Sequence, residues 1–533
     1  MNRTLVCIWT VVVVLTASGT SVTFFGGAGR VGGSCALVER DARRVLVDCG
    51  SLYSEEVAGG GRDKPGFAFD PRGIDDVLVT HAHQDHAGRV PELIRAGFGG
   101  TVWMTAPTRE LLSIVWRTQV MYEDGALPWR WTRRSHKKGR MTVHWRDDCE
   151  WLGKIAKENL CSFTGPYREI GRQLETNVAD RVYVGLCATC QQLELDAVLK
   201  HVRVVDFDRE VRIGPFGVVF RPVKHLPGAA AVAFSDGESR FVFSGDLGTL
   251  RSRLTEKIDP AEKADAVFVE CTYGDASYGD AQTAAAELLR FQRTVGETVK
   301  AGGLAWIPAF ALDRSQRVLI EIAEGMKAGL IGRDVPVYYL SPSSRQMAQA
   351  YVEHPGWFDN GSVAGLAELL PRSRKSFNAK KSAPGAGILL TTSGMMDAGY
   401  SLSYLPDLAQ RTNVTVCLVG YQAPGTHGNR LKRGAKVLKV TDGGERKTVE
   451  VNCRVEDFAC FSGHGDAREI ERWLANNWQS KIYLVHGDRK SLDARRQGLR
   501  ERFHADVEIA EPGRKYDIIT RTSQCQQAEG VVK

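Results

Sequence analysis

The amino-acid sequence predicts an α/β protein with several domains. Short apolar runs, such as 77–80 and 304–310, alternate with segments of helical hydrophobic spacing, such as 282–300 and 315–328. The chain has 533 residues, enough for roughly two to four domains. Apolar residues make up 43% of it and charged residues 25%, which excludes collagenous, disordered and disulfide-scaffold proteins. The strand–helix alternation therefore indicates the fold class.

The first 19 residues allow two interpretations. Arg3, the apolar stretch 5–16 and the small residues 17–19 form the pattern of a secretory signal peptide. The Val-rich run 11–14 is equally suited to a buried strand. No stretch reaches the roughly 18 apolar residues that a membrane span needs. Several of the 12 cysteines stand in apolar runs, as in reducing compartments, so we expect a cytoplasmic protein without a membrane partner, with export as the alternative.

Short strands with tight turns dominate the first half of the chain. Glycine-rich or polar turns separate them, and one strand leads into a helical segment at 91–98. The predicted strands are 22–27, 35–40, 43–50, 77–80, 217–225, 229–234, 239–246 and 264–270.

Longer helix–strand alternation follows, and short strands then return. The helices of this second part are predicted at 282–300, 315–328 and 344–351, and its strands at 304–310, 335–340, 387–394 and 415–421. The returning strands are 457–464 and 481–487, with a helix between them that begins at the N-cap Asp466.

The change from short strands to longer helix–strand alternation, and back to short strands, predicts an inserted domain. The expected divisions are an extra N-terminal segment (1–19), a first domain (20–271) that contains an irregular insertion at about 120–200, an inserted α/β domain (272–450), and a segment that returns to the first domain (451–533).

The motif HAHQDH, at residues 81–86, carries the strongest chemical signal. It lies between an apolar strand and a helical segment, and its imidazoles and carboxylate are ligand types that Zn²⁺ accepts. Six residues cannot complete the coordination of two ions, so further ligands must come from other strand ends. The candidates for those ligands are His225, Asp246 and His486.

The motif resembles a known family. HAHQDHAG resembles the signature of metallo-β-lactamase-fold hydrolases, and Asp48, His225 and Asp246 stand where that family's other motifs fall. One position departs from the family pattern: in KHLPGAA, Lys224 stands where the family usually has a small residue before the histidine.

Further motifs resemble the β-CASP subfamily. FVECTYGD with Glu270, FSGHGD with His464 and LVHGD with His486 resemble its three additional motifs, in the same order. Residues 390–399 and 420–431 resemble segments of its bacterial ribonucleases and of the eukaryotic pre-mRNA 3′-end cleavage endonuclease. The likeness covers residues 22 to about 488 and implies a four-layer αβ/βα sandwich with an inserted β-CASP cap.

The resemblance also implies a site with two zinc ions. His81, His83 and His225 would bind one ion, and Asp85, His86 and His486 the other. Asp246 would bridge the ions, and Asp48 would orient a ligand. The implied catalytic residues are His464 as general acid, Glu270 as its orienting carboxylate, and Asp85.

Several residues are candidates for contact with nucleic acid. Ser393 and Gly394 offer backbone donors on a loop, and His427 lies in a Gly-rich loop, where a plain turn residue is the alternative. The basic run 128–140 mixes tryptophans with cations, which suits base stacking and phosphate contact, and a solvated loop is its alternative. The candidates in this run are Trp129, Arg130, Arg133 and Arg134.

Four cysteines suggest a third, structural zinc. Cys187 and Cys190 have the spacing of a zinc knuckle, and Cys149 with Cys161 could complete four thiolates. Two buried thiols, a disulfide or ligation by His144 are the alternatives.

Together these features predict a zinc-dependent ribonuclease that acts on single-stranded RNA, endonucleolytically, in a cleft between core and cap. His486 favours RNA, since DNA-repair members of the family carry Val at that motif. The net charge of +7 is compatible with a polyanion but does not require one. A β-CASP DNA nuclease, a catalytically silent RNA-binding scaffold and a small-molecule hydrolase are the alternatives, and a homodimer is an open expectation.

Overall fold

The structure is a computed structural model, and part of the chain is described in it. The segments 1–18, 133–141 and 146–194 lie outside the described residues, and so do the predicted sites at Arg133, Arg134 and the four cysteines. The described residues are 19–52, 66–122, 129–132, 142–145, 195–250, 259–278, 281–358, 363–374, 383–442 and 445–518. Within these segments, no helix has both the length and the apolar character to span a membrane.

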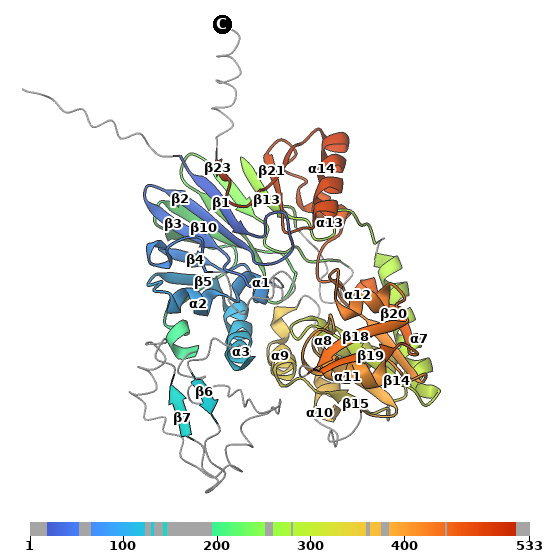
Figure 1. Ribbon diagram of the computed structural model, residues 1–533. Coiled ribbons are helices and arrows are strands. Elements are labelled where there is room, and N and C mark those ends of the chain that lie inside the picture. Colours follow the sequence, from blue (N-terminus) through green and yellow to red (C-terminus); the bar gives the residue numbers. More distant parts are fainter. Residues whose placement is uncertain are drawn as a thin grey trace, which may run out of the picture.

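Two seven-stranded sheets form the first part of the molecule (Figure 1). The first contains, in spatial order, β23 (Lys515–Asp517), β1 (Ser21–Gly26), β2 (Cys35–Arg40), β3 (Arg43–Val47), β4 (Asp76–Leu78), β5 (Thr101–Thr105) and β8 (Val202–Val205). The second contains β22 (Asp506–Ile509), β21 (Lys481–Val485), β13 (Ala266–Glu270), β12 (Arg240–Phe243), β11 (Ala230–Ser235), β10 (Phe216–Pro222) and β9 (Glu210–Ile213).

The two sheets pack face to face through alternating apolar residues. Phe24 of β1 contacts Phe268 of β13, with ring centroids 5.5 Å apart, and Phe243 of β12 stacks on Phe268 at 4.6 Å. The opposite faces are covered by helices, because the other residues of each strand are also apolar. These helices are α1 (Gln84–Ala87), α2 (Val90–Arg95) and α3 (Ala106–Tyr122) on the first sheet, and α13 (Ala467–Trp473) and α14 (Arg489–Phe503) on the second. The α/β prediction and its four-layer arrangement are confirmed.

A parallel five-stranded sheet forms the second part, beside the sandwich (Figure 1). Its strands are β15 (Val337–Tyr339), β16 (Gly387–Thr391), β14 (Leu304–Pro308), β17 (Val414–Leu418) and β20 (Arg454–Asp457). The central strand β14 is apolar and buried on both faces: Ala305 and Ile307 lie in one core, Leu304 and Trp306 in the other. The edge strand β20 is polar and only partly buried.

Helices and a hairpin cover the two faces of this sheet. The first core receives α7 (Ala281–Lys300), α8 (Arg314–Lys327), α9 (Pro342–Glu353) and α10 (Ala364–Arg372). The second receives α11 (Gly399–Leu408), α12 (His427–Lys432) and the hairpin of β18 (Val437–Asp442) and β19 (Glu445–Glu450).

Two details differ from the sequence predictions. The segment 457–464 is not a strand, because it contains a 3-10 turn, η3 (Ala459–Phe461). The strand before it, β20, pairs with β17 in the five-stranded sheet, which is called the cap sheet below. Residues 129–132 and 142–145, placed in an irregular insertion, form an antiparallel hairpin of β6 (Trp129–Thr132) and β7 (Thr142–Trp145). The first difference depends on pairing between segments distant in sequence, which local patterns do not specify. The hairpin joins neighbouring strands and was not predicted.

Candidate metal centre

The predicted ligands meet at one edge of the sandwich. His81 follows β4, His225 follows β10, Asp246 follows β12 and His486 follows β21 directly. In the second sheet β12 pairs in parallel with β13, and β13 with β21, so the carboxyl ends of β12 and β21 lie at the same edge. In the first sheet β4 runs parallel to β3 and β5.

Close backbone packing brings α1 to this edge. A Cβ on Gly50, which follows β3, would lie 1.7 Å from the carbonyl oxygen of Asp85. Only glycine therefore fits there, and the short helix that carries Asp85 and His86 is held against the end of the first sheet.

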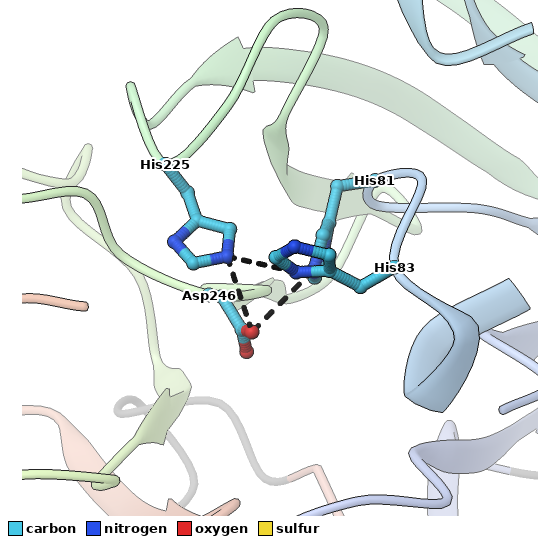
Figure 2. Close-up of side chains that lie close together, drawn as sticks. All are labelled: His81, His83, His225 and Asp246. Atoms are coloured by element: carbon cyan, nitrogen blue, oxygen red, sulfur yellow. Dashed lines mark hydrogen bonds and ion pairs between the residues drawn. The ribbon is translucent and has the colours of Figure 1, made fainter. Parts of the chain in front are cut away.

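His81, His83 and His225 form one group of converging nitrogens (Figure 2). His83 Nδ1 lies 3.1 Å from His81 Nε2 and 3.1 Å from His225 Nε2. Burial lowers the pKa of all three imidazoles, which favours the neutral form whose lone pair can bind a cation. The arrangement is that of a nitrogen-rich metal site.

Asp85, His86 and His486 form a second group. Asp85 Oδ2 lies 3.3 Å from His486 Nε2 and 4.0 Å from His86 Nε2. Burial by itself raises the pKa of the Asp85 carboxyl, but the hydrogen bond with His486 and the charge of His86 outweigh burial and lower it. The group therefore offers the Asp85 carboxylate beside two imidazole rings.

Asp246 lies between the two groups. Its Oδ2 is 3.4 Å from His81 Nε2 and 3.6 Å from His225 Nε2, whereas its Oδ1 is 3.2 Å from His86 Nε2 and 3.4 Å from His486 Nδ1. Both oxygens are buried, and neither accepts a hydrogen bond from the described residues. A buried carboxylate needs compensating positive charge. This donor set fits bound metal ions.

Asp48 orients His86 from behind. Its Oδ2 lies 2.7 Å from His86 Nδ1, and Thr80 donates to the same carboxylate through its backbone N–H (2.8 Å) and its hydroxyl (2.9 Å). These contacts direct His86 Nε2 toward Asp246. Asp48 and His486 have positive φ angles of 62° and 48°, so the backbone is strained on both sides of the site.

His464 and Glu270 form a pair beside the metal groups. Glu270 is fully buried, and its Oε1 lies 3.1 Å from His464 Nδ1. The backbone N–H groups of Leu247 and Thr272 donate to the two carboxylate oxygens at 2.9 and 3.0 Å, so Glu270 is rigidly held. Burial lowers the pKa of His464, but the charges of Glu270 and Asp246 outweigh burial and raise it. The raised pKa favours the protonated ring of His464, with its Nδ1 facing Glu270.

The cap contributes a contact that sequence reasoning missed. Arg317 of α8 donates through Nη2 to the backbone carbonyl of His225 at 2.8 Å, and its Nε pairs with Asp313 at 2.5 Å. Nothing in the local sequence distinguishes Arg317 from an ordinary helix arginine, because its partner is 92 positions away.

The residues predicted to contact nucleic acid have the following partners in the structure. The Ser393 N–H donates within its own loop to Ala398 O at 3.2 Å. The carbonyl of Gly394 accepts from Gln422 at 3.1 Å. His427 is the first residue of α12, and its Nδ1 is paired with Asp397 at 2.5 Å. Of the basic run, only the backbone of β6, which contains Trp129 and Arg130, is described.

Comparison with known protein families gives three matches. Residues 28–299 match the metallo-β-lactamase superfamily, and residues 315–431 match the β-CASP domain. Residues 448–510 match the Zn-dependent metallo-hydrolase RNA specificity domain.

Curated relatives match most of the chain. The transcription termination factor FttA of Methanosarcina mazei is 31% identical over 503 residues, which are 88% of this chain and 67% of that protein. FttA of Methanocaldococcus jannaschii is 28% identical over 491 residues, 89% of this chain and 68% of that protein. Ribonuclease TTHA0252 of Thermus thermophilus is 28% identical over 482 residues, 88% of this chain and 93% of that protein.

Proposed function

The chain belongs to the metallo-β-lactamase superfamily and is a metal-dependent hydrolase with a β-CASP domain, and from this premise we propose that it is a two-zinc ribonuclease acting on single-stranded RNA. The observation that carries the proposal is Asp246, whose two buried oxygens face two separate sets of ligand atoms. A carboxylate shared in this way is the arrangement that two-metal phosphodiesterases use.

The proposed ligands divide between two ions. His81, His83 and His225 would hold one zinc, and Asp85, His86 and His486 the other, with Asp246 shared. When bound, two such ions lower the pKa of a water and neutralise the charge of a phosphate. Nitrogen-rich sets with one or two carboxylates suit zinc better than magnesium or calcium, which prefer oxygen.

His464 would supply the proton. A leaving sugar oxygen needs one, and His464 would donate it from Nε2, because Nδ1 faces Glu270. Glu270 fixes the tautomer and balances the charge of the protonated ring, as a buried carboxylate does for other catalytic histidines. His464 Nδ1 is also 3.8 Å from Asp246 Oδ2, so the acid lies directly beside the shared carboxylate.

The choice of RNA is supported by two likenesses. Residues 448–510, which include His464 and His486, match a domain named for RNA specificity. The Thermus thermophilus relative, which the match covers almost completely, is named a ribonuclease. Endonucleolytic cleavage and the domain boundaries of the sequence analysis are part of the proposal.

Cleavage of paired RNA and DNA substrates tests the function. End-labelled single-stranded RNA and DNA of one sequence are incubated with the wild type and with His464→Ala, each with and without a chelator. We expect chelator-sensitive cutting of RNA only, at internal positions, and a loss of at least about 100-fold in the variant.

A matched control uses His201→Ala. The ring of His201 bonds the backbone carbonyl of Gly100 at 2.9 Å and lies outside the metal groups, so its removal should leave cutting unchanged. Cutting of DNA alone would replace RNA by DNA as the substrate. No cutting of either would refute the nuclease assignment.

A further inference from the structure

Three tyrosine rings extend from His464 along the boundary between core and cap. Tyr273 follows β13, and its ring centroid is 6.0 Å from that of His464. Tyr278 meets Tyr273 edge to face at 5.3 Å, and Tyr421 meets it at 6.5 Å. Tyr421 follows β17 of the cap sheet, so the cluster contains rings from both parts of the molecule.

Hydrogen bonds hold the backbone near these rings. Tyr273 forms a bridge with Asp466, and the N–H of Tyr278 donates to the Asp466 carboxylate at 2.9 Å. On the cap side, Gln422, next to Tyr421, donates to the carbonyls of Gly394 and Gly420, each at 3.1 Å. Rings on rigid supports lose little entropy when they bind a ligand.

Partial exposure separates these rings from the structural tyrosines of the cap. Tyr339 and Tyr351 are 1% and 0% exposed and belong to the apolar core. Tyr273, Tyr278 and Tyr421 are each only half-buried. Each of the three residues therefore keeps some contact with solvent beside the predicted general acid.

We propose that Tyr273 and Tyr421 form a stacking subsite for the nucleobase of the nucleotide that carries the leaving oxygen. This rests on the proposed ribonuclease function. His464 must contact that oxygen, and the base is joined to the same sugar, so a ring next to His464 lies within its reach. Aromatic side chains bind unpaired bases by stacking, which tolerates different sequences because every base has a π-face.

The subsite needs both parts of the molecule. Tyr273 follows β13 of the sandwich and Tyr421 follows β17 of the five-stranded sheet, so a base stacked there would contact segments next to both sheets together with the general acid. The cap would in this way contribute directly to binding of single-stranded RNA, and duplex RNA, whose bases are already stacked, would bind less well.

A cycle of ring removal and base removal tests the subsite. Three proteins are compared: the wild type, Tyr421→Ala and Tyr421→Phe. Each is given an oligoribonucleotide with one mapped cleavage site and a series of the same RNA in which one nucleotide at a time lacks its base. The wild type should lose roughly tenfold in kcat/KM when the abasic nucleotide is the one on the leaving side. Tyr421→Ala should lose roughly tenfold on the intact RNA and nothing further on that abasic RNA, whereas Tyr421→Phe keeps the ring and should resemble the wild type.

Tyr404→Ala is the matched control. Tyr404 is also a cap tyrosine paired with another, Tyr400, at 6.4 Å on α11, so its removal tests the general effect of losing a ring. It should show the same response to the abasic series as the wild type.

The possible outcomes distinguish failure of the subsite proposal from failure of the proposed ribonuclease function. If removal of the ring and removal of the base each lower kcat/KM and the two losses multiply, the subsite is overturned. It is also overturned if kcat/KM of the wild type does not change at any abasic position. This second readout does not depend on the folding of any variant. A wild type that does not cleave the intact RNA overturns the proposed function and the subsite with it.

Discussion

Arg317 of the cap donates a hydrogen bond to the backbone carbonyl of His225, a predicted metal ligand, at 2.8 Å. The arginine is buried, and its charge is balanced by Asp313, which also accepts a hydrogen bond from the Tyr351 hydroxyl at 3.1 Å. His225 is held from a second side, because its Nδ1 lies 2.7 Å from the carbonyl of Gly463. The cap thereby helps to position a ligand that the core supplies.

Removal of this contact should weaken metal binding. We expect Arg317→Met to destabilise the protein by about 3–5 kcal/mol, since it leaves Asp313 buried and unpaired. The double variant Arg317→Met/Asp313→Asn removes both charges and should regain most of that stability while still losing zinc to a chelator faster than the wild type. Thermal unfolding and the rate of zinc release measure the two effects.

Arg345→Met controls for loss of a cap arginine. Arg345 donates to the Ser373 hydroxyl (2.6 Å) and the Leu370 carbonyl (3.1 Å), both within the cap. Its zinc release should match the wild type. Equal zinc release from the double variant and the wild type would show that Arg317 has only a structural role.

Glu270→Gln should lower kcat without removing metal. Glutamine keeps the shape of the side chain but loses the charge that balances a protonated His464. A loss of roughly 10- to 100-fold in kcat is expected, with zinc content unchanged. Steady-state kinetics and atomic emission check the two parts, with the partly exposed Glu262→Gln as the control. An unchanged kcat would exclude Glu270 as the orienting carboxylate.

Asp246→Asn should abolish binding of two metal ions at once. The neutral amide cannot compensate two cations, and its NH₂ group would face imidazole nitrogens. Fewer than two zinc ions per chain and a lower melting temperature in zinc are expected, because bound ligand stabilises the folded state. Native mass spectrometry gives the stoichiometry. Two ions per chain in the variant would contradict the bridging role.

The His427–Asp397 pair should make the cap's stability depend on pH. The hydrogen bond to Asp397 raises the pKa of His427 above its usual value of about 6.5, against the opposing effect of burial. Because the folded pKa is the higher one, the stabilisation is fully present below about pH 6.5 and is lost as the pH rises through the folded value.

His427→Gln tests that sign. The difference in melting temperature between the wild type and His427→Gln should be largest near pH 6 and shrink toward pH 9. His201→Gln, outside this pair, serves as the control. A difference that grows with pH would mean that the pair does not stabilise the charged imidazole.

Much of the fold and of the candidate site was predictable from short-range patterns. The hydrophobic period of 282–300 and 315–328 predicts the helices found at Ala281–Lys300 and Arg314–Lys327 within one residue, because each needs only an apolar stripe to bury. The cluster at 81–86 is local in sequence, so its ligand types and its place between strand and helix could be read directly.

Other features were decided by the tertiary structure alone. The direction of each Asp246 oxygen, the pairing of β20 with β17, the bond from Arg317 to His225 and the approach of Tyr421 to Tyr273 join segments far apart in the chain. The sequence by itself determined which residues can bind metal and which segments form strands or helices, because those properties depend on neighbours a few residues away. The distances among them depend on how whole sheets and helices pack, since a contact between distant segments forms only when the complete core brings them together.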